Sequence, residues 1–571
     1  MSAPDSPLPA PRPRLRLLFR PDGWTLGTPL LALLLALPVL VVAAFVFAPA
    51  GDVWLHLKET VLAEYLRHSL WLMLGVGSGV LLIGVPAAWL VSACEFRGRR
   101  LLEWALLLPM AMPAYILAYT WTGLADFAGP IQSALRAQFG WSYGDYWFPE
   151  LRSLPGAVLM LTLVLYPYVY LLARAAFLEQ AHSVLEVARS LGQGPRAAFF
   201  RVALPLARPA IVTGLMLALM ETLADYGTVQ YFGLTTFTTG IFRTWFGLGD
   251  AAAAAQLSAV LMGAVLLLIL IERLSRRRAR YHHASLRRST PRRTLGGGKT
   301  LLVLGLALLP VLFGFLIPAG QLALWALEQR AGWMHAEFLA LGLNSLRVAA
   351  MAAGLTLALA LLLAYGQRLR PLPLIRGSVR LAAMGYAVPG TVIAIGVMLP
   401  LAFIDNRIDD FMRAHFGMST GLLLSGTLVA LLFAYAVRFM AVAVNTLEAG
   451  LGRIRPSMDQ AARSLGQRPA GVIRRVHLPM LRASLFTALL MVFVDVLKEL
   501  PATLILRPFN FNTLAVRAFE LASDERLAEA AAPALFIVLA GMLPVLLLAR
   551  TLGARTPSAG TPATGVLHAE D

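Results

Sequence analysis

The segment Ala188-Arg-Ser-Leu-Gly192 recurs 274 positions later as Ala462-Arg-Ser-Leu-Gly466. Each copy is followed at the same distance by a Val-x-Leu-Pro sequence, which ends at Pro205 in the first copy and at Pro479 in the second. A repeat with such a long period indicates two similar halves within one polypeptide. The architecture of one half therefore predicts the architecture of the whole chain.

The composition places both halves in a membrane. Of the 571 residues, 58% are hydrophobic and 14% are charged, and the mean hydropathy is +0.70. An ordinary soluble domain has about 25% charged residues, so the composition excludes a soluble fold, and it excludes intrinsic disorder as well. The net charge of +18 is more typical of basic loops on one side of a bilayer than of nucleic-acid binding. With a single cysteine, Cys94, the chain has no intrachain disulfide and no cysteine metal cluster.

Apolar runs of about 20 residues can cross a bilayer, and the chain has twelve of them. Of its 49 lysines and arginines, 36 lie in the N-terminus, in every second loop and in the C-terminal tail, which predicts that both termini are cytoplasmic. We predict spans at 26–48, 68–94, 101–125, 154–178, 207–228, 253–272, 301–327, 345–366, 379–404, 421–444, 482–503 and 529–550.

These features predict an all-α polytopic membrane protein, in which twelve transmembrane helices form a parallel pseudo-two-fold repeat of two six-helix halves. The predicted segments are a basic N-terminus (1–25), the first half (26–273), a basic linker (274–300), the second half (301–551) and a cytoplasmic tail (552–571).

A cytoplasmic loop precedes the fifth span of each half. In the first copy, 182–191 has apolar residues at helical spacing and ends at Gly192, a typical C-cap position. A second helical stretch follows, and we expect Pro205 to stop it. A short helix with an apolar stripe and a cationic rim suits docking into a groove of another protein. The alternative is a helix lying on anionic lipid. That interpretation is weaker, because the same loop occurs twice, each time before the fifth span of its half.

Acidic residues also recur at the offset of 274. Glu221 and Asp225 lie four positions apart, as do Asp495 and Glu499, so each pair falls on one face of a helix. Intramembrane carboxylates mark a pathway or a pairing, and hard cations prefer carboxylate oxygens. We predict that these four residues line a translocation pathway and act as metal ligands. The alternative is a structural role, with Lys498 paired to Asp495 or to a neighbouring acid.

The repeated loop resembles the EAA loop of binding-protein-dependent ABC importer permeases, which is Glu-Ala-Ala, three residues, Gly, nine residues, then Ile-x-Leu-Pro. The copies at 182–206 and 456–480 keep this spacing, with Val187 for Ala, Gln460 for Glu and Val for Ile twice; Asp459 could replace the missing acid. The resemblance implies that the loops couple the chain to an ATPase. The implied coupling residues are Glu186, Ala188, Gly192, Pro205, Gln460, Ala462, Gly466 and Pro479.

The stretches 221–250 and 495–529 resemble fused, two-half permeases of ferric iron importers; related permeases carry thiamine or phosphonates. The resemblance implies a non-catalytic subunit in the bacterial inner membrane, with two copies of a cytoplasmic ATPase and one periplasmic solute-binding protein as partners. This chain would bind no cofactor, and ATP and magnesium would bind the ATPase. The alternative from another class is a secondary transporter driven by an ion gradient.

Overall fold

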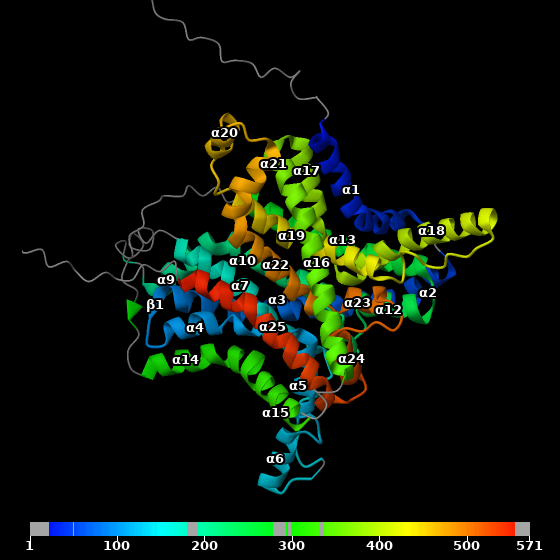
Figure 1. Cartoon of the computed structure of the whole chain (residues 1–571). Coiled ribbons are helices and arrows are strands. Elements are labelled where there is room, and N and C mark those ends of the chain that lie inside the picture. The colour runs from blue at the N-terminus through cyan, green and yellow to red at the C-terminus, as the bar shows by residue number, and fades with distance from the viewer. Residues whose placement is uncertain are drawn as a thin grey trace, which may run out of the picture.

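The computed structural model describes residues 22–49, 51–142, 144–179, 192, 194–277, 293–294, 298–329 and 336–553. Within these ranges, eleven helices are long and apolar enough to cross a membrane, and a bent pair brings the number to twelve if it counts as one span. The predicted all-α fold is confirmed, and the bundle is shown in Figure 1.

The elements of the first half begin with α1. They are α1 (Gly23–Ala44), η2 (Phe45–Phe47), α2 (Asp52–Thr60), α3 (Leu62–Ala93), β1 (Cys94–Glu95), α4 (Arg99–Ala105), η3 (Leu108–Ala111), α5 (Ala114–Ala125), α6 (Pro130–Phe139), α7 (Leu154–Glu179), α9 (Pro195–Ala198), η4 (Phe199–Ala203), α10 (Leu204–Ala224), α11 (Gly227–Tyr231), α12 (Phe237–Phe242), η5 (Arg243–Gly247) and α13 (Ala251–Arg277).

The second half follows the two-residue strand β2 (Arg293–Thr294), which pairs in parallel with β1. Its elements are α14 (Gly298–Val311), η6 (Leu312–Leu316), α15 (Ile317–Glu328), α16 (Ala336–Leu369), α17 (Pro373–Ala382), η8 (Ala383–Ala387), α18 (Gly390–Phe416), α19 (Leu428–Leu451), α20 (Pro456–Ser464), α21 (Pro469–Val472), η9 (Ile473–His477), α22 (Leu478–Leu497), α23 (Pro501–Leu506), α24 (Leu514–Ser523) and α25 (Leu527–Gly553).

Three helices form the core of each half: α3, α7 and α10 in the first, and α16, α19 and α22 in the second. Small residues allow α3 and α7 to approach closely. A Cβ on Gly75 would lie 2.7 Å from Val158 Cγ2, and one on Gly79 would lie 2.5 Å from Thr162 Oγ1. The Gly75–Gly79 spacing is the small-xxx-small pattern with which membrane helices pack.

The two halves exchange their first helices. Helix α1 packs on α16, α17 and α18 of the second half, whereas α15 contacts α5 of the first. A Cβ on Gly396 would lie 2.3 Å from the Pro38 carbonyl oxygen, so α1 and α18 are in close backbone contact. At its start, α1 is capped by Asp22, which also accepts a 2.8 Å hydrogen bond from Arg370 Nε. Hydrogen bonds from Thr25 and Arg370 lower the pKa of Asp22 to about 2.

The third predicted span of each half is wrong as a straight helix. In the first half, 99–111 and 114–139 meet at a 91° bend, and in the second, the helix predicted from 379 is broken by η8 and restarts at Gly390. Pro113 and Pro389 stand at the two breaks as N-caps of α5 and α18. Each proline lacks an N–H for the helix ladder, which explains a break there.

Pro205 does not stop the second helical stretch as predicted, because the chain runs on through it into α10. The five residues before Leu204 form a π-helical turn, and the same arrangement precedes Pro479 and Pro318. A proline in a regular α-helix clashes with the carbonyl four residues back. A widened π turn removes that clash and lets the span continue.

Candidate functional site: a charged cavity between the halves

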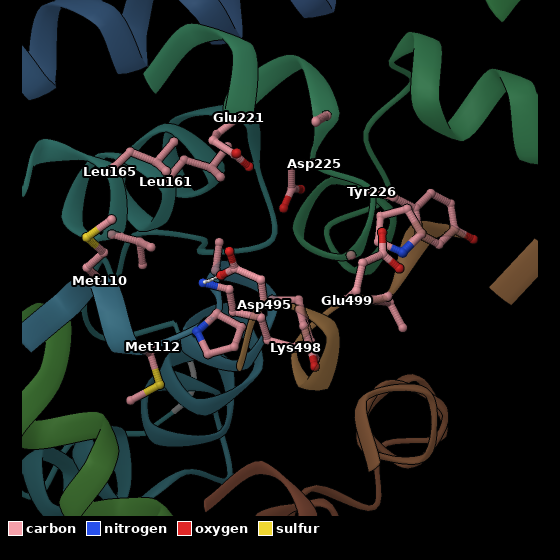
Figure 2. Close-up of a pocket in the computed structure, with 18 of the residues that line it drawn as sticks. Met110, Met112, Leu161, Leu165, Glu221, Asp225, Tyr226, Asp495, Lys498 and Glu499 are labelled. Carbon is pink, nitrogen blue, oxygen red and sulfur yellow. Dashed lines mark ion pairs between the residues drawn. The ribbon is translucent and has the colours of Figure 1, made fainter. Parts of the chain in front are cut away.

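The four predicted acids line one cavity of about 170 Å³ where the halves meet. Figure 2 shows Glu221 and Asp225 on one side of this space, with Asp495, Lys498 and Glu499 opposite them. The two halves therefore supply matched pairs of carboxylates to a shared space.

Asp225 and Glu499 each accept hydrogen bonds from amides of the next short helix, from the position just before its N-cap residue. The α10 helix ends at Ala224, so Asp225 lies beyond it, and its carboxylate accepts 3.1 Å bonds from the amides of Thr228 and Val229 in α11. The carboxylate of Glu499 accepts 3.2 Å bonds from the amides of Ala502 and Thr503 in α23. The predicted spans 207–228 and 482–503 are thus too long at their ends, because each acid turns the chain and starts a short helix.

Glu221 and Asp495 lie in the last turns of α10 and α22 and are the second matched pair. Asp495 forms a 2.8 Å ion pair with Lys498, the pairing considered from sequence. Glu221 borders a small adjoining pocket together with Tyr168 and Tyr386.

Arg438 is the cavity residue that the sequence analysis missed. It falls within the predicted span 421–444 and lies within α19, with Nε 3.6 Å from Glu499 Oε1 and Nη1 donating to the Val388 carbonyl at 3.2 Å. Gly390 makes room for this pair, since a Cβ there would lie 2.6 Å from Glu499 Oε1. A buried carboxylate needs a charged or hydrogen-bonding partner, so the acids in the predicted spans could have pointed to an arginine within another span.

The charges in the cavity do not balance. Four carboxylates face two cations, Arg438 and Lys498, which leaves a formal excess of two negative charges. Among the described residues, no group of three or more His, Cys, Asp or Glu side chains is arranged to hold a metal ion. In this structure two of the acids accept bonds from helix amides and a third is paired with lysine, and the metal-ligand role of the four acids stays a prediction.

The second repeated loop contains α20, which bears the exposed Gln460 and the buried Ala462. Gly466 ends it with φ +79°, and Gln467 N–H donates to the Ala462 carbonyl at 3.1 Å. Leu465 just before the cap is 80% exposed, so an apolar side chain stands outward at the tip. In the first copy, Gly192 has a matching φ of +76°, while Glu186 and Ala188 lie outside the described residues.

Asp459 faces the bundle and not the solvent. It accepts two 3.1 Å bonds from Arg368 of α16 and lies 2.7 Å from His477 Nε2. Arg368 also donates to the Leu451 carbonyl at 2.7 Å. We call Arg368, Asp459 and His477 the α20 clamp, because together they tie α20 to α16 and to the turn before α22.

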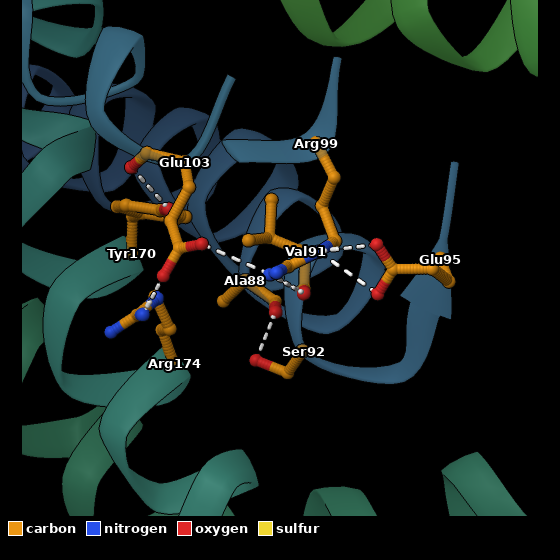
Figure 3. Close-up of polar contacts among 8 residues, drawn as sticks. All are labelled: Ala88, Val91, Ser92, Glu95, Arg99, Glu103, Tyr170 and Arg174. Atoms are coloured by element: carbon orange, nitrogen blue, oxygen red, sulfur yellow. Dashed lines mark hydrogen bonds and ion pairs between the residues drawn. The ribbon is translucent and has the colours of Figure 1, made fainter. Parts of the chain in front are cut away.

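The first half has a buried charge network at the same end (Figure 3). Arg99 Nη1 donates to Glu103 Oε2 at 2.9 Å, and Arg174 Nη2 donates to the other oxygen of that carboxylate. Arg99 also forms a 3.2 Å ion pair with Glu95. Through Glu103, Arg99 and Arg174 join α4 to α7 inside the protein.

Comparisons with known proteins agree with this arrangement. Residues 80–280 match the family model "Binding-protein-dependent transport system inner membrane component". A probable molybdenum ABC transporter permease of Haloferax volcanii is 30% identical over 210 residues, covering 36% of this chain and 73% of that protein. The chain belongs to this permease family.

Two further relatives show how much of the permease is matched. The Fe(3+)-transport system permease protein FbpB 2 of Haemophilus influenzae is 28% identical over 539 residues, or 93% of this chain and 98% of that protein. The molybdenum transport system permease protein of Escherichia coli is 30% identical over 149 residues, 26% of this chain and 62% of its own length. The protein is thus the permease subunit of an ABC importer, a multi-pass inner-membrane protein.

Proposed function

We propose that this permease carries ferric iron from an external binding protein into the cytoplasm through the cavity between its halves. The observation that supports iron is the excess of carboxylates over cations around that cavity, because hard cations prefer oxygen ligands. A relative matched along 98% of its length is named as a Fe(3+)-transport permease.

Within this proposal, Glu221 and Asp495 bind the cargo, while Asp225 and Glu499 stabilise the short helices α11 and α23 beside the cavity. The first two carboxylates are free of capping bonds to a helix start within the described chain. They are one turn from the ends of α10 and α22, so a shift of these helices moves both carboxylates with respect to each other. Opening of the halves would move the Glu221 and Asp495 carboxylates apart, and closing would bring them together.

The energy source in this proposal is a separate cytoplasmic ATPase in two copies, which holds the ATP and magnesium. Each copy would seat one repeated loop, around Gly192 and around α20. The exposed Leu465 beside the exposed Gln460 supports α20 as a docking helix. Both termini would be cytoplasmic, and the solute-binding protein would dock on the opposite face.

An oxyanion is the second candidate cargo. Molybdenum and sulfate permeases are among the relatives, and Arg438 and Lys498 both line the cavity. Both cations are paired, with Glu499 and Asp495, which makes the cavity a weaker anion site than a cation site.

The test is uptake into liposomes that contain the permease, its ATPase and its binding protein, with labelled ferric iron, molybdate, thiamine or a phosphonate. We expect ATP-dependent iron uptake that falls at least tenfold in Glu221→Gln and is unchanged in the exposed control Asp410→Asn. Uptake of molybdate, thiamine or a phosphonate in place of iron would overturn the cargo. Iron uptake that is equal in Glu221→Gln and wild type would overturn the role of that acid.

A further inference from the structure

A second, larger cavity lies on the outer side of the first half. It has a volume of about 890 Å³ and lies between α3, α5, α7 and the arch formed by α14 and η6, and it extends to Ile131 of α6 and to Phe148, Pro149 and Leu151 in the loop before α7. None of its described lining residues is charged, and they include Leu82, Trp89, Leu159, Leu306 and Phe313. Helices α3 and α7 and the continuous segment from α14 to α15 are long and apolar enough to cross a membrane, so most of this cavity lies at the depth of the lipid chains.

The matching place in the other half is closed. There α1 packs against α16 and α18 so tightly that a Cβ on Gly366 would lie 2.1 Å from Thr28 Oγ1. The α14 helix is the counterpart of α1, but its contacts with the rest of the bundle are mainly to α4 and η3 and not to the long helices α3 and α7. Contact with the bundle resumes at Gly314, where a Cβ would lie 3.1 Å from the Leu163 carbonyl. Figure 1 shows α14 and α15 as an arch beside α4 and α5.

Basic residues lie at the end of this cavity that the charge distribution predicts to be cytoplasmic. Cys94 lines it, and Arg97 and Arg100 follow within a few residues and are exposed. Helix α4, which begins beside them, contacts α14. The arginine between them, Arg99, forms ion pairs with Glu95 and Glu103, so of the three arginines in this described segment Arg97 and Arg100 are the two that are exposed.

We propose that this cavity is a binding site for an anionic phospholipid of the cytoplasmic leaflet. Its acyl chain fills the space between α14 and the bundle, since a dry apolar cavity at this depth gives water no polar partners. Its phosphate lies beside Arg97 and Arg100, as headgroups do at basic pockets between membrane helices. The lipid thereby takes the place of the close helix contact that α1 makes in the other half.

The test is native mass spectrometry of the purified permease exchanged into nanodiscs of phosphatidylglycerol or of phosphatidylcholine. We expect one phosphatidylglycerol retained in preference to phosphatidylcholine, and a loss of about fivefold in that preference for each of Arg97→Gln and Arg100→Gln. Arg407→Gln, at an exposed position of α18 that does not line the cavity, is the control and should change nothing. Equal retention of both lipids, or no effect of the two substitutions, would overturn the headgroup site.

The acyl-chain part is tested by filling the cavity. Ala307 lines it and its neighbour Leu308 does not, so Ala307→Trp should abolish retention while Leu308→Trp leaves it intact. A photoreactive phosphatidylglycerol should label peptides of α3 and α14 in the wild type and not in Ala307→Trp. Retention that is unchanged in Ala307→Trp, or a copurifying polypeptide crosslinked to α14 in place of lipid, would overturn the proposal. No readout depends on transport.

Discussion

Asp225 and Glu499 show how one side chain decides where a membrane helix ends. Each follows the last turn of a span and uses its carboxylate oxygens to cap the short helix that comes next. An unsatisfied amide is costly in a membrane, so the caps allow α11 and α23 to exist at this depth. Sequence spacing alone suggested that all four acids share one role, whereas the hydrogen bonds divide them into two.

The division predicts different effects of two substitutions at Asp225. Asparagine is also a good cap, so Asp225→Asn should keep the stability of the wild type, while Asp225→Ala should lower it by about 1 kcal/mol. Thermal unfolding of the purified permease in detergent measures both, with Asp126→Ala in an exposed loop as the control. Equal destabilisation by Asn and Ala would show that charge, and not capping, is what Asp225 supplies.

Gly466 makes a prediction about coupling. Its φ of +79° disfavours any side chain, by about 1 kcal/mol for most residues, and β-branched valine is among the worst. Gly466→Val should therefore misplace the tip of α20 and lower transport with little loss of folded protein. Asparagine tolerates this conformation, so Gly466→Asn should retain most of the transport.

The measurement for Gly466 is stimulation of ATP hydrolysis by the loaded binding protein, compared with uptake. We expect both to fall in Gly466→Val and to recover in Gly466→Asn. Wild-type coupling in Gly466→Val would remove α20 from the coupling role.

At the scale of elements, the α20 clamp is the contact through which movement of this loop can reach α16 and α22. Arg368 and Asp459 are only 15% and 16% exposed at their side chains, so breaking their bonds leaves a poorly solvated charge. Asp459→Asn should cost on the order of 2 kcal/mol and weaken transport more than ATPase binding. ATPase pull-down beside uptake separates the two effects, and a proportional loss of both would argue for a merely structural clamp.

Helix α3 approaches α7 at three of its glycines, Gly75, Gly79 and Gly84. Gly79→Leu would place a side chain against Thr162 and should destabilise the permease by about 1–3 kcal/mol. Gly263→Leu is the matched control, because a Cβ at Gly263 of α13 meets nothing within 4 Å. The comparison is the midpoint of thermal aggregation, and equal midpoints for the two variants would contradict the packing assigned to α3 and α7.

For the whole molecule, periodicity and hydropathy predicted the repeat, the all-α fold and up to twelve spans, because these depend on apolar length alone. The breaks at Pro113 and Pro389 were missed because a proline can either kink or end a membrane helix. Arg438 was not predicted as a cavity residue, because hydropathy alone does not show which side chain pairs with a buried carboxylate. The repeat was enough to predict that the four acids share one site. Their separate roles follow from the hydrogen bonds and ion pairs of the folded chain.

The exchange of helices between the halves predicts that the chain can be cut in two. Since α1 packs on the second half and α15 and α25 contact the first, each half buries much of its apolar surface only against the other. Residues 1–285 and 286–571 expressed together as separate chains should therefore copurify and restore most of the transport, while either half alone should be degraded.

The close contact between α1 and α18 provides the control for this experiment. Gly396→Leu would collide with the Pro38 backbone and should prevent copurification, whereas Gly354→Leu, where a Cβ meets nothing within 4 Å, should not. Halves that are stable alone and fail to associate would mean that the exchanged helices contribute little, and that the covalent link holds the permease together. Because the interlocking contacts come from both ends of the chain, we expect association to survive the cut.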